Sequence, residues 1–211
     1  MIGSIISYVG NNSTVWGTGA FGTEQLYQIN QKAKYTAVRG PLTRQLLRNA
    51  RISVPEVYGD PALLTPLYFP DPREKKYEIG LVLRWSERNW IDAAASEGVL
   101  TIDLGDSDVE KVLKDILSCK KIITSSLHGL IIADAYGIPS AFLASDTPKG
   151  GIFKFIDYFS SVSKFRKPVN FDLPNEELSI ENLTKKFEFD ERSIDFNHAK
   201  LLRACPFLSE S

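Results

Sequence analysis

The segment from Lys121 to Leu143 constrains the fold more than any other part of the chain. An apolar run ends at Thr124 and is followed by two serines, an apolar-periodic segment over 127–136, and a second apolar run after Pro139. This order predicts a strand, a helix that begins after the serines, and a second strand. Two parallel strands with a helical crossover are the repeating unit of α/β folds, so the segment indicates a parallel sheet.

The same alternation of strands and helices extends over most of the chain. Apolar runs bounded by turn residues predict further strands at 14–19, 34–39, 55–58, 77–84 and 99–104. Helical periodicity predicts helices at 41–49, 62–64, 87–97, 108–119, 149–159, 179–187 and 193–205. Asp60 is the expected N-cap of the helix at 62–64, and Asp106 or Ser107 that of the helix at 108–119.

A proline-rich, charged stretch at 69–76 interrupts this pattern and predicts a domain boundary. We therefore predict an α/β protein with two Rossmann-like parallel-sheet units and a cleft between them. The predicted domains are residues 1–70, residues 71–172 and a helical tail, 173–211, that packs back across the first unit. With about three strands, the first sheet would have an exposed edge, so we expect self-association or a segment supplied by another chain.

Composition excludes several classes of function. The 211 residues are 43% hydrophobic and 24% charged, which is typical of a soluble globular protein, and the net charge of −1 argues against nucleic acid or a membrane surface as partner. Cys119 and Cys205 have no metal-binding spacing. No apolar stretch reaches the ~20 residues of a membrane span, and no basic region precedes the first apolar residues. A cytoplasmic protein without a metal site is expected.

His128 is the foremost candidate for chemistry. It lies in the first turn of the predicted helix, where unpaired backbone N–H groups and the helix dipole attract anions. An imidazole there is placed to contact or protonate a bound anion, although a lone histidine is also often a buried residue bonded to a carbonyl. Ser125 and Ser126 either cap the helix or contact the same ligand.

Two arginines also follow predicted strands. Arg39 and Arg84 carry guanidinium groups suited to bidentate pairing with a phosphate or carboxylate, and the alternative for each is a salt bridge, for Arg39 for instance to Asp60. The loop containing Lys149 and Gly150 is a further candidate for phosphate contact. Ligands of parallel sheets bind at the carboxyl ends of strands, where strand order reverses.

Other polar residues have structural interpretations. Asp134 lies on the side of its helix opposite His128, and Lys154 and Asp157 form a possible surface pair at i, i+3. His198 lies in a charged tail and is expected to be solvated.

Five segments together resemble the polysaccharide pyruvyl transferase family, over roughly residues 2 to 160. They are Val15–Gly19 (VWGTG), Ala37–Arg44 (AVRGPLTR), Tyr58–Leu64 (YGDPALL), Ser125–Pro139 (SSLHGLIIADAYGIP) and Lys154–Tyr158 (KFIDY). The resemblance implies two domains of the GT-B type, with the acceptor on the N-terminal side and phosphoenolpyruvate held mainly by the C-terminal domain.

The implied activity is transfer of the enolpyruvyl group of phosphoenolpyruvate to a sugar of an exopolysaccharide or cell-wall glycan, forming a ketal. The acceptor would be a glycan or lipid-linked sugar, no cofactor is implied, and a homo-oligomer is possible. His128 and Arg84 would be catalytic. The residues expected to bind the donor and its phosphate are Arg39, Ser125, Ser126, Leu127, Gly129, Lys149 and Gly150.

Two departures from the family pattern keep alternatives open. Typical members have a longer N-terminal region, so the first unit is expected to be truncated, and Arg84 stands where many members carry a proline–histidine pair. One alternative is a GT-B-like glycosyltransferase that uses a nucleotide sugar. Another is a non-catalytic or degenerate donor-binding module that needs a partner chain.

Overall fold

The computed structural model describes residues 3–71, 74–84, 86–87, 96–146, 149–173 and 175–208. The chain forms two compact units. Unit 1 comprises Met1–Leu64, Pro148–Phe165 and Ile194–Ser211, and unit 2 comprises Thr65–Thr147 and Arg166–Ser193. This division differs from the predicted domains 1–70, 71–172 and 173–211, because the end of the chain is shared between the units instead of forming a separate helical tail.

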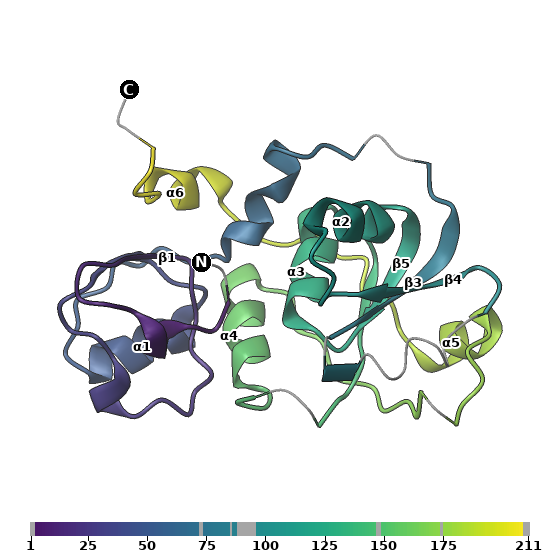
Figure 1. The fold of residues 1–211 in the computed structure, drawn as a ribbon, viewed down its shortest axis with the longest axis horizontal. Coiled ribbons are helices and arrows are strands. Elements are labelled where there is room, and N and C mark those ends of the chain that lie inside the picture. Colours follow the sequence, from purple (N-terminus) through teal and green to yellow (C-terminus); the bar gives the residue numbers. More distant parts are fainter. Residues whose placement is uncertain are drawn as a thin grey trace. The chain divides into compact units, whose positions relative to one another are not determined.

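Unit 2 is built on a four-stranded parallel sheet (Figure 1). Its strands are β3 (Tyr77–Leu83), β4 (Val99–Asp103), β5 (Cys119–Thr124) and β6 (Ser140–Phe142), in the order β4-β3-β5-β6. The helices α2 (Val109–Leu117) and α3 (Leu127–Ala135) precede and follow β5, and α5 (Ile180–Lys186) comes later in the chain. The predicted strands at 77–84 and 99–104, and the strand–helix–strand unit at 121–143, are confirmed.

Both faces of this sheet are buried, which explains why its strands are continuously apolar. Ile79 and Leu81 of β3 pack in one cluster with residues of the segment 171–187. Val82 packs in another cluster, with residues of α2 and α3. Consecutive side chains of a strand point to opposite faces, so each face receives its own layer.

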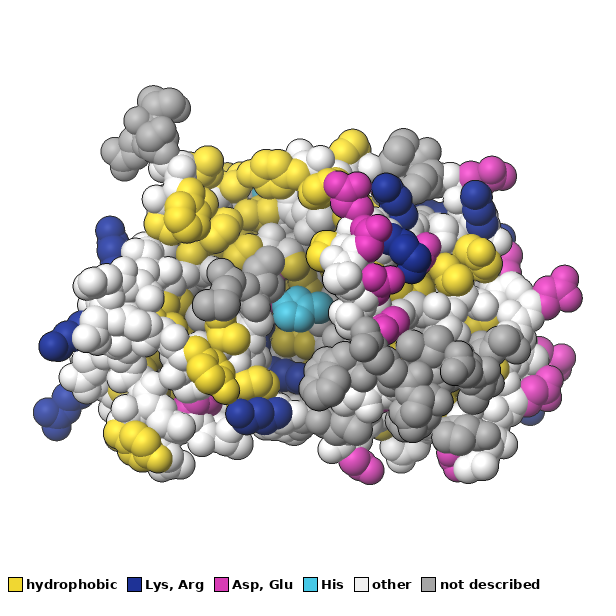
Figure 2. All heavy atoms as spheres, in the orientation of Figure 1, with side chains coloured by type: hydrophobic (Ala, Val, Ile, Leu, Met, Phe, Trp, Pro, Cys, Tyr) yellow, Lys and Arg dark blue, Asp and Glu magenta, His cyan; other side chains and the backbone are white. Residues whose placement is uncertain are grey.

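Side-chain caps begin two helices of unit 2, α2 and α5. Asp108, rather than the predicted Asp106 or Ser107, caps α2: its carboxylate accepts a hydrogen bond from Lys111 N at 2.9 Å. Acidic and basic side chains gather over α2 (Figure 2), where Lys111 pairs with Asp106 at 3.1 Å. The predicted helix at 87–97 lies almost entirely outside the described residues.

Unit 1 contains a smaller parallel sheet, β1 (Thr14–Trp16) with β2 (Lys34–Ala37). The predicted third strand at 55–58 is reduced to a single bridge between Val38 and Tyr58. The described helices of unit 1 are α1 (Pro41–Asn49), α4 (Phe153–Val162) and α6 (His198–Arg203), with the short 3-10 helices η1 (Ile6–Tyr8) and η2 (Leu26–Gln28). The 3-10 helix η3 (Pro61–Leu67) contains the boundary between the two units.

Residues 194–208 pack within unit 1, whereas the first part of the predicted tail, up to Ser193, belongs to unit 2. Leu201 is fully buried beside Ala37 and Leu64, and Trp16 donates from its indole Nε1 to the Leu201 carbonyl at 2.9 Å. The predicted cap at Asp60 is confirmed, because its carboxylate accepts from Ala62 N at 3.0 Å. No helix in the described part of the chain is long and apolar enough to cross a membrane.

Candidate functional site

The strand order of unit 2 identifies the edge of the sheet where a ligand is expected. From β3 the chain moves to β4 on one side, and from β4 it crosses to β5 on the other side of β3. Sheets of this order bind ligands at the carboxyl ends of the two strands where the direction reverses. Arg84 directly follows β3, and Ser125 directly follows β5, so both lie at that edge.

Thr124 and Gly129 fix the beginning of α3 on the end of β5. The Thr124 hydroxyl donates to the Val82 carbonyl at 2.8 Å and accepts from Ser126 N at 3.0 Å. A Cβ on Gly129 would lie only 2.3 Å from Thr124 Oγ1, so a side chain larger than hydrogen does not fit. Gly129, predicted as a donor-binding residue, therefore has at least a packing role.

The N–H groups of the first turn of α3 receive no side-chain cap. Ser126 occupies the N-cap position, but its side chain makes no capping hydrogen bond, and the first helical bond runs from Leu130 N to Ser126 O. The cap hydroxyl therefore does not neutralise the N–H groups of the first turn, which carry the positive end of the helix dipole. His128 is the second residue of this turn and is half-buried, whereas the Leu127 side chain is buried.

A buried carboxylate links three strand ends beside this turn. Glu87 is fully buried and accepts hydrogen bonds from the hydroxyls of Ser125, which follows β5, and Ser145, which follows β6. Arg84 donates from Nη2 to Glu87 Oε1 at 3.1 Å and to Ser145 Oγ at 3.0 Å. Glu87 thus holds the Arg84 guanidinium and the Ser125 hydroxyl in fixed positions.

The charge of this network is balanced internally. Burial alone would raise the pKa of Glu87, but hydrogen bonds from Ser125 and Ser145 and the charge of Arg84 together hold that pKa below its ordinary value. Glu87 is therefore ionised at neutral pH and compensates the guanidinium charge. Arg84 therefore forms a salt bridge, which was one of its two interpretations, and this pairing fixes the direction of its N–H donors.

Arg39 lies in unit 1 and is engaged within that unit. Its guanidinium is fully buried and donates to Asp157 Oδ2 at 3.0 Å, to Ser4 Oγ at 2.6 Å and to the Ala20 carbonyl at 2.7 Å. The partner is therefore Asp157 and not Asp60. Asp157 also accepts from both the backbone N and the hydroxyl of Thr43, so the prediction that it forms a surface pair with Lys154 is wrong.

The loop with Lys149 and Gly150 also belongs to unit 1. The Lys149 ammonium lies 5.2 Å from the centroid of the Phe21 ring. Gly150 has a φ of +76°, and a Cβ there would lie 2.4 Å from the Phe21 carbonyl oxygen. Contact with Phe21 therefore shapes this loop, and Phe21 directly follows Ala20, whose carbonyl accepts a hydrogen bond from Arg39.

Of the predicted site residues, the structure brings together Arg84, Ser125, Ser126, Leu127, His128 and Gly129 in unit 2. Glu87 is the residue that sequence reasoning missed. The sequence pattern that could have indicated Glu87 is an acidic residue three positions after Arg84, which follows a buried strand. Asp134 pairs with the buried Arg166 in unit 2, which agrees with its structural interpretation.

Comparisons with known proteins identify the family of the chain. The model of the polysaccharide pyruvyl transferase family matches residues 2–147. An uncharacterized protein of Acanthamoeba polyphaga mimivirus is 31% identical over 168 residues, which are 75% of this chain and 58% of that protein. The chain thus spans somewhat more than half the length of this relative, and no solved structure matches. On the extent of the family match, the chain belongs to the polysaccharide pyruvyl transferase family.

Proposed function

We propose that the chain takes part in pyruvyl transfer from phosphoenolpyruvate to a sugar diol of a glycan or lipid-linked acceptor. The observation that carries the proposal is the first turn of α3, which presents His128 and helical N–H groups at the reversal point of the sheet, beside Glu87 and Arg84. Phosphoenolpyruvate carries a phosphate and a carboxylate. Both groups match N–H donors and the positive end of a helix dipole.

In this proposal the phosphate lies against the N–H groups of residues 127–129. A single helix terminus carries only about half a unit of charge, so a multiply charged donor needs further hydrogen-bond donors. Arg84 supplies them in a direction that Glu87 and Ser145 fix. Such preorganised donors stabilise charge that develops as the phosphate leaves.

His128 is the proposed general acid. Protonation of carbon 3 of the enol group turns that carbon into a methyl group and makes carbon 2 electrophilic. One sugar hydroxyl adds to carbon 2 and loses its proton, inorganic phosphate departs, and the second hydroxyl closes the ketal with loss of its proton. The half-buried position of His128 in the first helical turn suits it either to give the first proton or to assist the departing phosphate.

Titration calorimetry with phosphoenolpyruvate tests the donor site directly. The wild-type chain should bind phosphoenolpyruvate, and His128→Ala should bind it more weakly while keeping the thermal unfolding temperature. His198 of α6 is exposed, so His198→Ala is the matched control and should bind phosphoenolpyruvate as the wild type does. Binding of UDP- or GDP-sugars without any response to phosphoenolpyruvate would replace the proposal with a nucleotide-sugar glycosyltransferase.

A further inference from the structure

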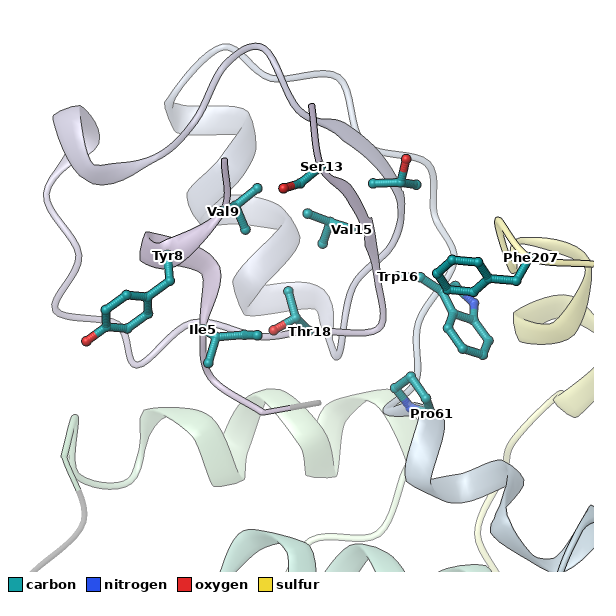
Figure 3. A pocket seen from close by; sticks show the side chains of 10 residues that line it. Ile5, Tyr8, Val9, Ser13, Val15, Trp16, Thr18, Pro61 and Phe207 are labelled. Carbon is teal, nitrogen blue, oxygen red and sulfur yellow. The ribbon is translucent and has the colours of Figure 1, made fainter. Parts of the chain in front are cut away.

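A pocket of about 260 Å³ in unit 1 is a poor match for a charged ligand (Figure 3). Its described lining consists of aliphatic, aromatic and hydroxyl side chains, among them Val15 and Phe207, and includes no charged group. A phosphate or carboxylate binds where charged groups or N–H donors replace its water. Unit 2 offers such donors in Arg84 and the first turn of α3.

Glu87 places a full negative charge beside these donors. Its carboxylate is completely buried, and Oε1 accepts from Arg84 Nη2 at 3.1 Å and from Ser145 Oγ at 2.6 Å. The other oxygen, Oε2, accepts from the Ser125 hydroxyl and from the backbone N of Arg84 at 3.3 Å. A carboxylate repels a bound phosphate, so Glu87 lowers the affinity for the ligand that the site is proposed to hold.

Holding Arg84 in place does not by itself require a carboxylate. Arg84 Nη2 also donates to Ser145 Oγ at 3.0 Å, so a neutral oxygen already shares in orienting the guanidinium. A side-chain amide at position 87 could accept from the same N–H, and the serine hydroxyls can donate or accept. The property that only the carboxylate supplies is its charge.

This charge determines how strongly the site holds a phosphate. The charges of Arg84 and Glu87 cancel, which leaves about half a unit of positive charge at the first turn of α3. Without the carboxylate, the same groups would present about one and a half units to a phosphate of about −1.5 to −2. In a partly buried site this difference should change the affinity about tenfold or more, because charges interact more strongly there than in water.

We propose that Glu87 is a charge-balancing residue that keeps the site from retaining inorganic phosphate, the leaving group of the proposed transfer. The inference rests on the proposed function and deepens it, because it assigns Glu87 to product release. Inorganic phosphate would contact the same N–H groups as the phosphate of the donor, and product release limits the turnover of many enzymes. The same repulsion weakens donor binding, which raises KM without raising the barrier of the bound donor.

Titration calorimetry with inorganic phosphate tests this role in Glu87→Gln, which keeps an acceptor oxygen and removes the charge. The variant should bind phosphate at least tenfold more tightly than the wild type, and both kcat and KM for phosphoenolpyruvate should fall. If Glu87 only positions Arg84, the variant should bind phosphate more weakly and raise KM. Weaker or unchanged phosphate binding would overturn the proposal. Ser145→Ala removes a bond to Glu87 but no charge, so this matched control should not bind phosphate more tightly.

A second pair of variants separates the charge of Glu87 from the position of Arg84, and also serves if Glu87→Gln does not fold. In Arg84→Gln the hydroxyls of Ser125 and Ser145 and the backbone N of residue 84 still donate to Glu87. Adding Glu87→Gln then leaves neither a buried ion nor a guanidinium that could move. The double variant should bind phosphate at least tenfold more tightly than Arg84→Gln, and equal affinities would overturn the proposal.

The wild type distinguishes failure of this inference from failure of the proposed function. A wild-type chain that binds phosphate but not phosphoenolpyruvate would contradict pyruvyl transfer, while the phosphate affinities of the variants would still decide the role of Glu87. Binding of neither anion, by the wild type and by Glu87→Gln, would overturn both.

Discussion

Arg39 and Arg84 both follow the carboxyl end of a buried strand, but the structure gives them different surroundings. Arg39 is completely buried in unit 1, and its three donor atoms bond to Asp157, Ser4 and the Ala20 carbonyl. Arg84 is 11% exposed in its side chain and bonds to Glu87 and Ser145 beside the first turn of α3. An arginine after a strand therefore predicts a paired guanidinium, and only its surroundings decide whether that group lies at a site.

The buried ion pair of Arg39 is expected to contribute more to stability than an exposed pair. The ion pair of Arg39 and Asp157 ties the turn before α1 to the helix α4, which comes more than a hundred residues later. Gly40 packs against the same residue, since a Cβ there would lie 2.0 Å from the backbone carbonyl oxygen of Asp157 and 2.5 Å from its carboxylate Oδ1. Removing one partner of such a pair leaves a buried charge without compensation, which is far more costly than losing an exposed pair.

The largest expected effect concerns the site in unit 2. His128→Ala should lower the rate of pyruvyl transfer by ~10²–10⁴-fold, which is the usual loss when an acid–base group is removed. The measurement is release of inorganic phosphate from phosphoenolpyruvate in the presence of a sugar acceptor. Unchanged turnover with lower stability would show that His128 is a core residue of unit 2.

The second effect separates the two arginines directly. Arg39→Ala should lower the free energy of unfolding by about 3–5 kcal/mol, because Asp157 stays buried without its partner. Arg84→Ala should cost only about 1–2 kcal/mol, since Ser125 and Ser145 still donate to Glu87, but it should weaken binding of phosphoenolpyruvate. Urea denaturation and calorimetry of both variants measure the contrast. Equal losses of stability in the two variants would show that Arg39 and Arg84 contribute equally to the fold.

The third effect tests how α3 is held against β5. Gly129→Ala should cost about 1–3 kcal/mol, because its methyl group would overlap Thr124 Oγ1 and force the first turn to move. The same displacement should weaken donor binding, which calorimetry with phosphoenolpyruvate can detect. A variant that binds normally at lower stability would indicate that the first turn does not contact the donor.

The smallest effect is a dependence on pH. Since the pKa of Glu87 is lower in the folded chain than its ordinary value, its ionised form stabilises the fold above that ordinary value. This contribution is lost as the pH falls through the lowered pKa. Glu87→Gln should therefore be about 1–2 kcal/mol less stable than wild type at pH 7, and the difference should shrink toward pH 3. A constant difference across urea titrations at several pH values would contradict this.

Much of the fold could be predicted from local sequence patterns. The strands β3 and β4 and the helices α1 to α3 lie within the predicted ranges, because each has a continuous apolar run or a 3.6-residue period between turn residues. Strand β5 begins at Cys119, two residues before the predicted start and at the residue predicted to end the preceding helix. The prediction of a strand at 55–58 was only partly right, since an extended segment becomes a strand only when a neighbour pairs with it. The GT-B-like arrangement of the units stays a prediction.

The candidate site could be predicted in part for the same reason. Residues 125–129 are contiguous, and a helix that starts after a strand places all of them at one end of the sheet, whatever the rest of the fold. Glu87 could not be found in this way. Its role depends on three strand ends that lie far apart in sequence and meet only because the sheet order is β4-β3-β5-β6.

The sequence by itself determined the α/β class, the helix start at Ser126, the family and the position of His128, since these follow from short-range periodicity, capping and contiguous motifs. Tertiary structure alone decided the partner of Arg39 and the buried position of Glu87. Those features depend on which distant segments share a core and which backbone groups find a neighbour. Burial and pairing are properties of the packed chain and are not encoded in any single stretch of residues.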